Sequence, residues 1–279
     1  MAATDSTGNT DITDDTNGTV SEYSDGLRIE RDGKVAILTL CRPERRNALD
    51  ADLCTAIAEA LEDVVAEDTS DTPHSPVRAV LIRGEGPAFC AGANLKGGAY
   101  AAGFFNTVER MINTIADLPV PVIADVQGPA VGAGCQLVLA CDLRVMGPKA
   151  RVWVPAVDHG FSLDKWTINR AVELLGGAVA RNVLIAGAQV GQKAAVASGF
   201  AMLGGDSADA LSMTHIISRK APMPMQHFKM VMNNPVHTDP SEELLAKIDY
   251  LGGACWISED AAEARAARAD KRRPEFKGR

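Results

Sequence analysis

The sequence predicts an α/β fold in which a mostly parallel sheet is covered by helices. The chain twice runs from a short apolar strand through a loop of small residues into a helix, with the loops at residues 84–96 and 128–134. Apolar side chains recur at helical spacing along residues 49–65 and 104–118, the pattern of a helix with one buried face. Strands that alternate with helices favour parallel pairing, with the helices packed outside the sheet.

Other segments extend this pattern in chain order. Residues 27–40 read as strands joined by a turn at residues 30–33, and Pro43 ends the second strand. Asp50 is expected to cap the helix that follows. Further strands are expected at 79–83, 120–126 and 152–154, and further helices at 167–175, 178–185, 207–218, 226–232, 242–256 and 259–271.

Composition limits the class of protein. The net charge of −8 and the pI near 5.2 argue against nucleic acid as a partner, because phosphate contacts need a basic surface. No window approaches the ~20 apolar residues of a membrane span, and the N-terminus lacks the features of a signal peptide, so a cytoplasmic protein is expected. Residues 1–24 are polar and rich in Thr, Asp and Gly, a composition typical of a disordered tail.

The six cysteines fall inside predicted strands, helices and packed loops, without a C-x-x-C pair. Buried, reduced thiols are therefore expected in place of disulfides or metal ligands. Neither a metal nor a resident cofactor is expected. Cys90 and Cys135 would serve as nucleophiles only beside a basic partner.

The stretch at residues 126–142, VQGPAVGAGCQLVLACD, is the part of the sequence that favours a binding site most strongly. Glycines permit close backbone approach and unusual φ angles. A helix that starts after such a loop directs its free N–H groups back into the loop, where they suit an anion or an oxygen that becomes negative during a reaction. Cys135 and Gln136 open this helix, so no strong acid, base or nucleophile stands at its start.

Four segments in register resemble the enoyl-CoA hydratase/isomerase (crotonase) family. They are RPERRNALD at residues 42–50, AFCAGANLK at 88–96, PVIADVQGPAVGAGCQLVLACD at 121–142 and SEDAAEARAARADKRRPEF at 258–276. The resemblance implies a spiral of ββα units at residues 25–206 and a helical oligomerisation region at 207–279. It also implies assembly as a trimer or a dimer of trimers, and a coenzyme A thioester of a fatty acid as the ligand.

The resemblance assigns roles to individual residues. The family's oxyanion hole consists of two backbone N–H groups, which map onto Ala93 and Ala133. Coenzyme A contacts map onto the two loops and onto the end of the chain, with Arg and Lys suited to phosphates. These positions are Arg45, Arg46, Ala48, Ala91, Asn94, Leu95, Lys96, Phe276 and Lys277. The acyl pocket is expected beside Trp153 and Trp166.

The sequence departs from the family at the residues that activate water. Hydratases of the family carry two glutamates as general acid and base, and their positions are here Gln136 and Ala156. Gln does not exchange a proton near neutral pH, and Ala has no polar group. Ordinary hydratase chemistry is therefore not expected.

Asp164 and His159 are the remaining candidates for proton transfer. Asp164 matches a position where dienoyl-CoA isomerases of the family hold a catalytic aspartate, but it would equally cap the helix that follows. His159 titrates in the right range, although a lone histidine is more often surface or core. Two hypotheses stay open: a protein that binds a fatty acyl-CoA without hydrating it, and an enoyl-CoA isomerase or other enolate-forming lyase that uses Asp164.

Overall fold

The computed structural model describes residues 20–24, 26–66, 77–94, 103–233, 242, 246, 250, 253–254, 256–272 and 274. Most of the expected tail therefore lies outside the described residues. Its last part does not, because β1 (Val20–Ser24) pairs antiparallel with β2 (Leu27–Asp32). Residues 20–24 of the expected tail thus form the edge strand of the sheet, where backbone hydrogen bonds to β2 hold a segment of polar composition.

Seven strands form the main sheet, in the order β1-β2-β3-β4-β5-β7-β10. The first three are antiparallel, and every later neighbour in the sheet is parallel, as the alternation of strands and helices predicts. The turn between β2 and β3 lies at Gly33, where φ is +59°, slightly later than expected. The remaining strands are β3 (Val35–Leu40), β4 (Ala79–Gly84), β5 (Val122–Val126), β7 (Leu143–Met146) and β10 (Leu203–Gly204).

Helices cover both faces of this sheet. Leu38 and Leu40 of β3 belong to a core that includes α1 (Ala51–Ala66), α2 (Phe104–Asp117) and α3 (Ala133–Ala140). The alternate residues Val35 and Ile37 pack with α7 (Ser207–Ser218) on the other face. Because successive side chains of a strand point to opposite faces, a strand buried on both faces is mostly apolar, as VAILTL is apart from Thr39.

A small second sheet combines one strand before α3 with two strands after it. It has the order β6-β8-β9, built from β6 (Pro129–Val131), β8 (Arg151–Trp153) and β9 (Val190–Gly191). The short 3₁₀ turn η2 (Val157–His159) follows β8. Three helices then pack beside this sheet: α4 (Lys165–Leu175), α5 (Gly177–Ala186) and α6 (Gln192–Ala197).

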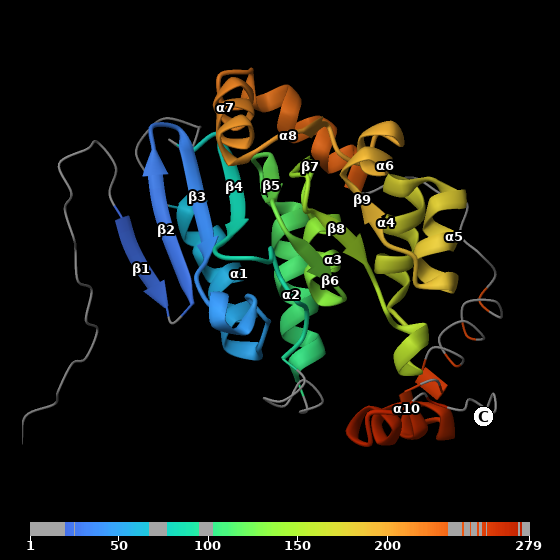
Figure 1. The fold of residues 1–279 in the computed structure, drawn as a ribbon. Helices are drawn as coiled ribbons and strands as arrows, with labels where there is room; N and C mark the ends of the chain where they lie inside the picture. Colours follow the sequence, from blue (N-terminus) through green and yellow to red (C-terminus); the bar gives the residue numbers. More distant parts are fainter. Residues whose placement is uncertain are drawn as a thin grey trace, which may run out of the picture.

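The last helices lie at opposite ends of the molecule (Figure 1). Near α7, α8 (Pro222–Asn233) is held by the buried Lys229, whose Nζ donates to Asp142 Oδ2 at 2.8 Å and to two backbone carbonyl oxygens. At the other end, α10 (Glu259–Ala269) packs against η2. Within the region expected for oligomerisation, residues 207–279, α7 packs on the sheet and α10 packs on η2. No helix among the described residues has the length and hydropathy needed to cross a membrane.

Candidate functional site

The two small-residue loops lie against each other. Cys90 and Ala130 form a parallel bridge, in which the Cys90 N–H donates to the Pro129 carbonyl oxygen and the Val131 N–H donates back to the Cys90 carbonyl oxygen. A Cβ on Gly134 would stand 2.3 Å from the Cys90 carbonyl oxygen. Only glycine allows this approach, so the glycines of one loop determine how closely the other loop packs.

Gly92 lets the loop that carries the Ala93 amide approach the Ala133 amide at the start of α3. Its φ is +87°, and a Cβ there would lie 2.4 Å from the Val131 carbonyl oxygen and 3.3 Å from the Ala133 nitrogen. Gly92 therefore packs directly against the first residue of α3. Ala133 follows the N-cap Gly132, so its N–H belongs to the free donors at the helix N-terminus.

The Ala93 N–H points away from Leu49, the residue with which Ala93 forms a parallel bridge. Leu49 donates to the Gly92 carbonyl oxygen at 2.8 Å and accepts from the Asn94 N–H at 2.7 Å. In such a parallel bridge the residue between the two bonds directs its own N–H to the opposite side. Within the described part of the chain, no hydrogen bond satisfies the Ala93 or Ala133 N–H. Two free donors thus meet where the α3 dipole favours negative charge.

The arginine-containing loop lies beside the Ala91–Asn94 segment. The Arg46 carbonyl oxygen accepts from the Ala91 N–H at 2.9 Å, and Ala48 N–H donates to the Arg45 carbonyl oxygen. Both arginine side chains are exposed, and among the described residues Arg45 pairs with Glu44 at 3.7 Å. Five of the nine residues expected to bind coenzyme A are thus brought together; Leu95, Lys96, Phe276 and Lys277 lie outside the described residues.

Asn47 holds these segments together, and the sequence reasoning missed it. It is fully buried at φ +55°. Its Nδ2 donates to the carbonyl oxygens of Glu85, Ala88 and Phe89, and its Oδ1 accepts from the Arg42 N–H. Asn is one of the few residues that tolerate a left-handed backbone. An Asn within a loop was therefore the feature of the sequence that could have indicated this structural role. Asp50 caps α1 as expected, accepting from the Leu53 N–H, and also pairs with Arg42 at 2.6 Å.

Gln136 is committed to a polar network with α4. Its Nε2 donates to Asp164 Oδ2 at 3.0 Å and to Thr167 Oγ1 at 2.7 Å. Thr167 in turn donates from its Oγ1 to Asp164 Oδ2 and from its N–H to Asp164 Oδ1. Asp164 is therefore the N-cap of α4, one of the two roles considered for it. The same contacts place the Asp164 carboxylate beside the Gln136 side chain near the start of α3.

Ala156, the other position at which a glutamate was expected to be replaced, is buried and apolar. It is 5% exposed and belongs to the same core as Ala133 and Cys135. Trp153 lies just before it, and its carbonyl oxygen accepts from the Gly132 N–H, so β8 lines the site. Trp166 is half-buried against this core at the start of α4. Residue 156 therefore adds a methyl group to this core and no acid or base.

The other reactive candidates are poorly suited to catalysis. Burial raises the pKa of the Cys90 and Cys135 thiols to about 12, so both remain protonated and weakly nucleophilic at neutral pH. Burial, and then the charge of Arg268, lowers the pKa of His159. The five described cysteines are free thiols, and Cys255 lies outside the described residues.

The two roles of Asp164 separate by mutation. We expect Asp164→Ala to lower the free energy of unfolding by about 1 kcal/mol, because α4 loses its N-cap. Asp164→Ser keeps a capping oxygen without an ionisable group and should stay close to wild type. Chemical denaturation of the three proteins measures the difference. Equal loss in both variants would show that the carboxylate charge, and not the cap, carries the stability.

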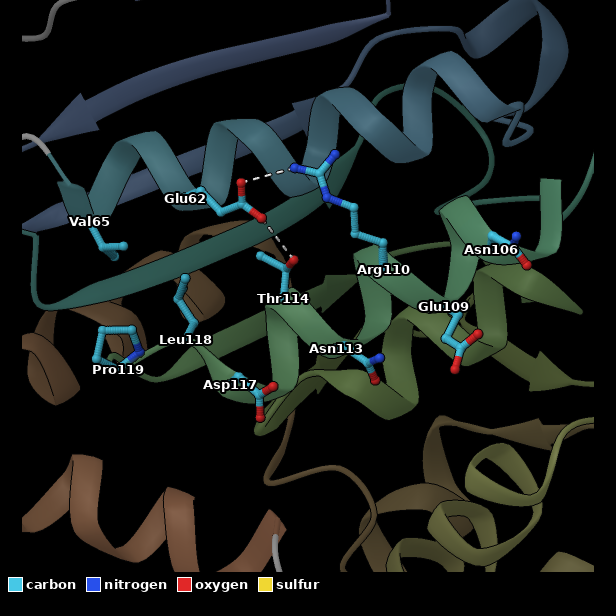
Figure 2. Close-up of a pocket in the computed structure, with 10 residues that line it drawn as sticks. All are labelled: Glu62, Val65, Asn106, Glu109, Arg110, Asn113, Thr114, Asp117, Leu118 and Pro119. Carbon is cyan, nitrogen blue, oxygen red and sulfur yellow. Dashed lines mark hydrogen bonds and ion pairs between the residues drawn. The ribbon is translucent and has the colours of Figure 1, made fainter. Parts of the chain in front are cut away.

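A surface groove between α1 and α2 is separate from this site. It has a volume of about 630 Å³ and is lined by Glu62 and Val65 of α1, by one side of α2 and by Leu118 and Pro119. Figure 2 shows Arg110 and Thr114 both directed at Glu62, at 3.0 and 3.3 Å. No residue of the two loops lines this groove, so we do not assign the chemistry to it.

Comparison with known proteins identifies the family of the chain. The family profile described as enoyl-CoA hydratase/isomerase matches residues 30–279. The chain belongs to this family. Among its relatives, the probable enoyl-CoA hydratase echA6 of Mycobacterium tuberculosis is 38% identical over 245 residues, covering 87% of this chain and 96% of the relative. The 2,3-dehydroadipyl-CoA hydratase of Escherichia coli is 31% identical, covering 91% and 99%.

Solved structures share the fold. Carnitinyl-CoA hydratase from Mycobacterium avium superposes with a TM-score of 0.75 at 30% identity, covering 91% of this chain and 99% of the other. Methylmalonyl-CoA decarboxylase in complex with 2-nitronate-propionyl-CoA gives 0.80 at 22% identity, covering 92% and 100%, which concerns the fold alone. The expected α/β crotonase fold is confirmed.

Proposed function

We propose that the protein binds a fatty acyl-CoA thioester in lipid metabolism without hydrating it. The observation that supports this most directly is the combination of two free amides, on Ala93 and Ala133, with Gln136 and Ala156 at the acid–base positions. The amides suit the thioester oxygen. Neither Gln136 nor Ala156 can deliver or accept a proton in a hydration step.

The polar network of Gln136 supports the same proposal. Its amide links α3 to the cap of α4, so its side chain serves packing between helices. The exposed Arg45 and Arg46, in the loop expected to bind coenzyme A, carry charges that suit phosphates. Neither arginine contributes to proton transfer. Relatives of this chain are named hydratases, and the resemblance places Gln136 and Ala156 of this chain at the positions of the hydratase glutamates.

Assembly as a homo-oligomer in the cytoplasm belongs to this proposal. α8 presents large apolar side chains to solvent, each more than half exposed: Met223, Phe228, Met230, Val231 and Met232. Apolar surface of this kind is typical of subunit interfaces. Light scattering should give three or six times the 29.4 kDa of the chain; a mass of one chain at micromolar concentration would contradict it.

Calorimetry tests the binding half of the proposal. Octanoyl-CoA should bind more tightly than free coenzyme A, because the thioester oxygen and the acyl chain add contacts that coenzyme A lacks. Free coenzyme A is the matched control. Equal affinity for the two ligands, or no binding of either, would contradict the proposal.

The alternative is an enoyl-CoA isomerase or related enolate-forming lyase. One observation favours it: the exposed Asp164 carboxylate lies 3.0 Å from the Gln136 amide nitrogen, within reach of the site. If it transfers a proton, Asp164→Ser abolishes turnover of a 3-enoyl-CoA while the helix cap persists. Unchanged turnover in that variant would exclude Asp164 as the catalytic group.

A further inference from the structure

Three aromatic side chains from distant parts of the chain meet at one end of the molecule. Trp256 lies with its ring centroid 4.8 Å from that of Phe161, at an interplanar angle of 15°. On its other side it meets the edge of Phe105, the second residue of α2, at 4.9 Å and 62°. Offset stacking and edge contacts at these distances are favourable for aromatic rings. Trp256 therefore bridges α2 and the segment after η2.

The segment that carries Phe161 also carries the wall of the thioester site. Phe161 N–H donates to the carbonyl oxygen of Ala156, the residue that replaces the second glutamate. Phe161 packs against the core that contains Ala133 and Ala156. The acyl group of a thioester held at the Ala93 and Ala133 amides would pass along this apolar wall.

The position of Trp256 is determined by the docking of α10. Gly160 has φ +65°, and a Cβ there would stand 2.8 Å from the Asp260 carbonyl oxygen. The start of α10 thus lies directly on the turn before Phe161. Ser258 caps α10 by accepting from the Ala261 N–H, which places Trp256 just before the cap. The Trp256 ring is therefore held in position by the backbone packing of α10 as well as by its aromatic neighbours.

A histidine extends the aromatic contacts of Trp256 and Phe161. His159 lies nearly parallel to Phe161, with centroids 6.0 Å apart. Burial lowers the pKa of His159, the Arg268 charge lowers it further, and only Asp158 opposes the shift. The aromatic surface formed by Phe105, Trp256 and Phe161 suits a hydrocarbon chain.

We propose that Trp256, held between Phe105 and Phe161, forms the far wall of the acyl pocket and limits the length of the acyl group. This rests on the proposed binding of an acyl-CoA thioester. A chain longer than the distance to Trp256 must displace the ring, so the wild-type protein prefers medium-length acyl groups.

The test compares butanoyl-, octanoyl- and hexadecanoyl-CoA by calorimetry. Trp256→Ala should raise the affinity for hexadecanoyl-CoA relative to butanoyl-CoA at least tenfold, because about two additional buried methylene groups are enough for that change. Trp256→Phe should keep the wild-type ratio. Ile257→Ala is the matched control, since the adjacent Ile257 is 87% exposed.

Two outcomes would overturn the proposal in distinguishable ways. An unchanged length ratio in a Trp256→Ala protein that still binds octanoyl-CoA would show that the ring only attaches α10. Absence of binding to every thioester by the wild type would overturn the proposed function as well. If Trp256→Ala lowers the melting temperature strongly, Phe105→Leu supplies the same readout, because it removes one neighbour of the ring and leaves the contact of α10 with Gly160.

Discussion

Gly92→Ala is expected to weaken the binding of octanoyl-CoA by about 100-fold. The new Cβ would stand 2.4 Å from the Val131 carbonyl oxygen and against the Ala133 nitrogen, so the two loops must separate. Separation misaligns both free amides, and two hydrogen bonds of about 1–1.5 kcal/mol each correspond to roughly this loss. Calorimetry with octanoyl-CoA measures it.

Gly33→Ala is the control for backbone strain. Gly33 also has a positive φ, +59°, but a Cβ there meets nothing within 4 Å. Each variant should lose about 1–3 kcal/mol of stability from the forced left-handed backbone, which denaturation monitors. Only Gly92→Ala should lose thioester binding. Equal affinities in the two variants would show that the contact of Gly92 with α3 does not position the amides.

Restoring the glutamates is expected to produce hydratase activity, and the structure predicts an obstacle to it. In Gln136→Glu the new carboxylate would face Asp164 at about the present 3.0 Å. Carboxylates this close cannot both ionise. The double variant Gln136→Glu, Ala156→Glu should therefore hydrate crotonyl-CoA weakly.

Adding Asp164→Asn should raise this activity, because Asn removes the opposing charge and caps helices as well as Asp does. We expect the triple variant to hydrate crotonyl-CoA at least 100-fold faster than the wild type, the lower range for general acid–base catalysis. Loss of the conjugated thioester absorbance reports the rate. A triple variant that binds crotonyl-CoA and remains inert would show that more than these carboxylates is missing.

Local patterns predicted the strands, the helices and their parallel order. Mostly apolar runs such as VAILTL predicted buried strands, and Asp50 predicted the start of α1. The positions of Ala93 and Ala133 followed from the family's motifs, because small residues are required wherever two backbones approach within van der Waals distance. The structure confirms that these loops meet.

Features that depend on contacts between distant segments were not predicted. Gln136 reads as an inert replacement in the sequence, and its contact with Asp164 joins residues 28 positions apart. Asn47 reaches carbonyls about 40 positions away. Trp256 meets Phe105 and Phe161 from the C-terminal segment. No periodicity or spacing along the chain encodes such pairings, since each depends on the finished fold.

The central claim is that the protein retains thioester binding and lacks hydration. It is tested most directly by mixing one preparation with crotonyl-CoA and with a longer 2-enoyl-CoA, and by following absorbance and heat of binding together. The account predicts saturable binding with no loss of the conjugated absorbance. Turnover above about 1 s⁻¹, an ordinary enzyme rate, would contradict it.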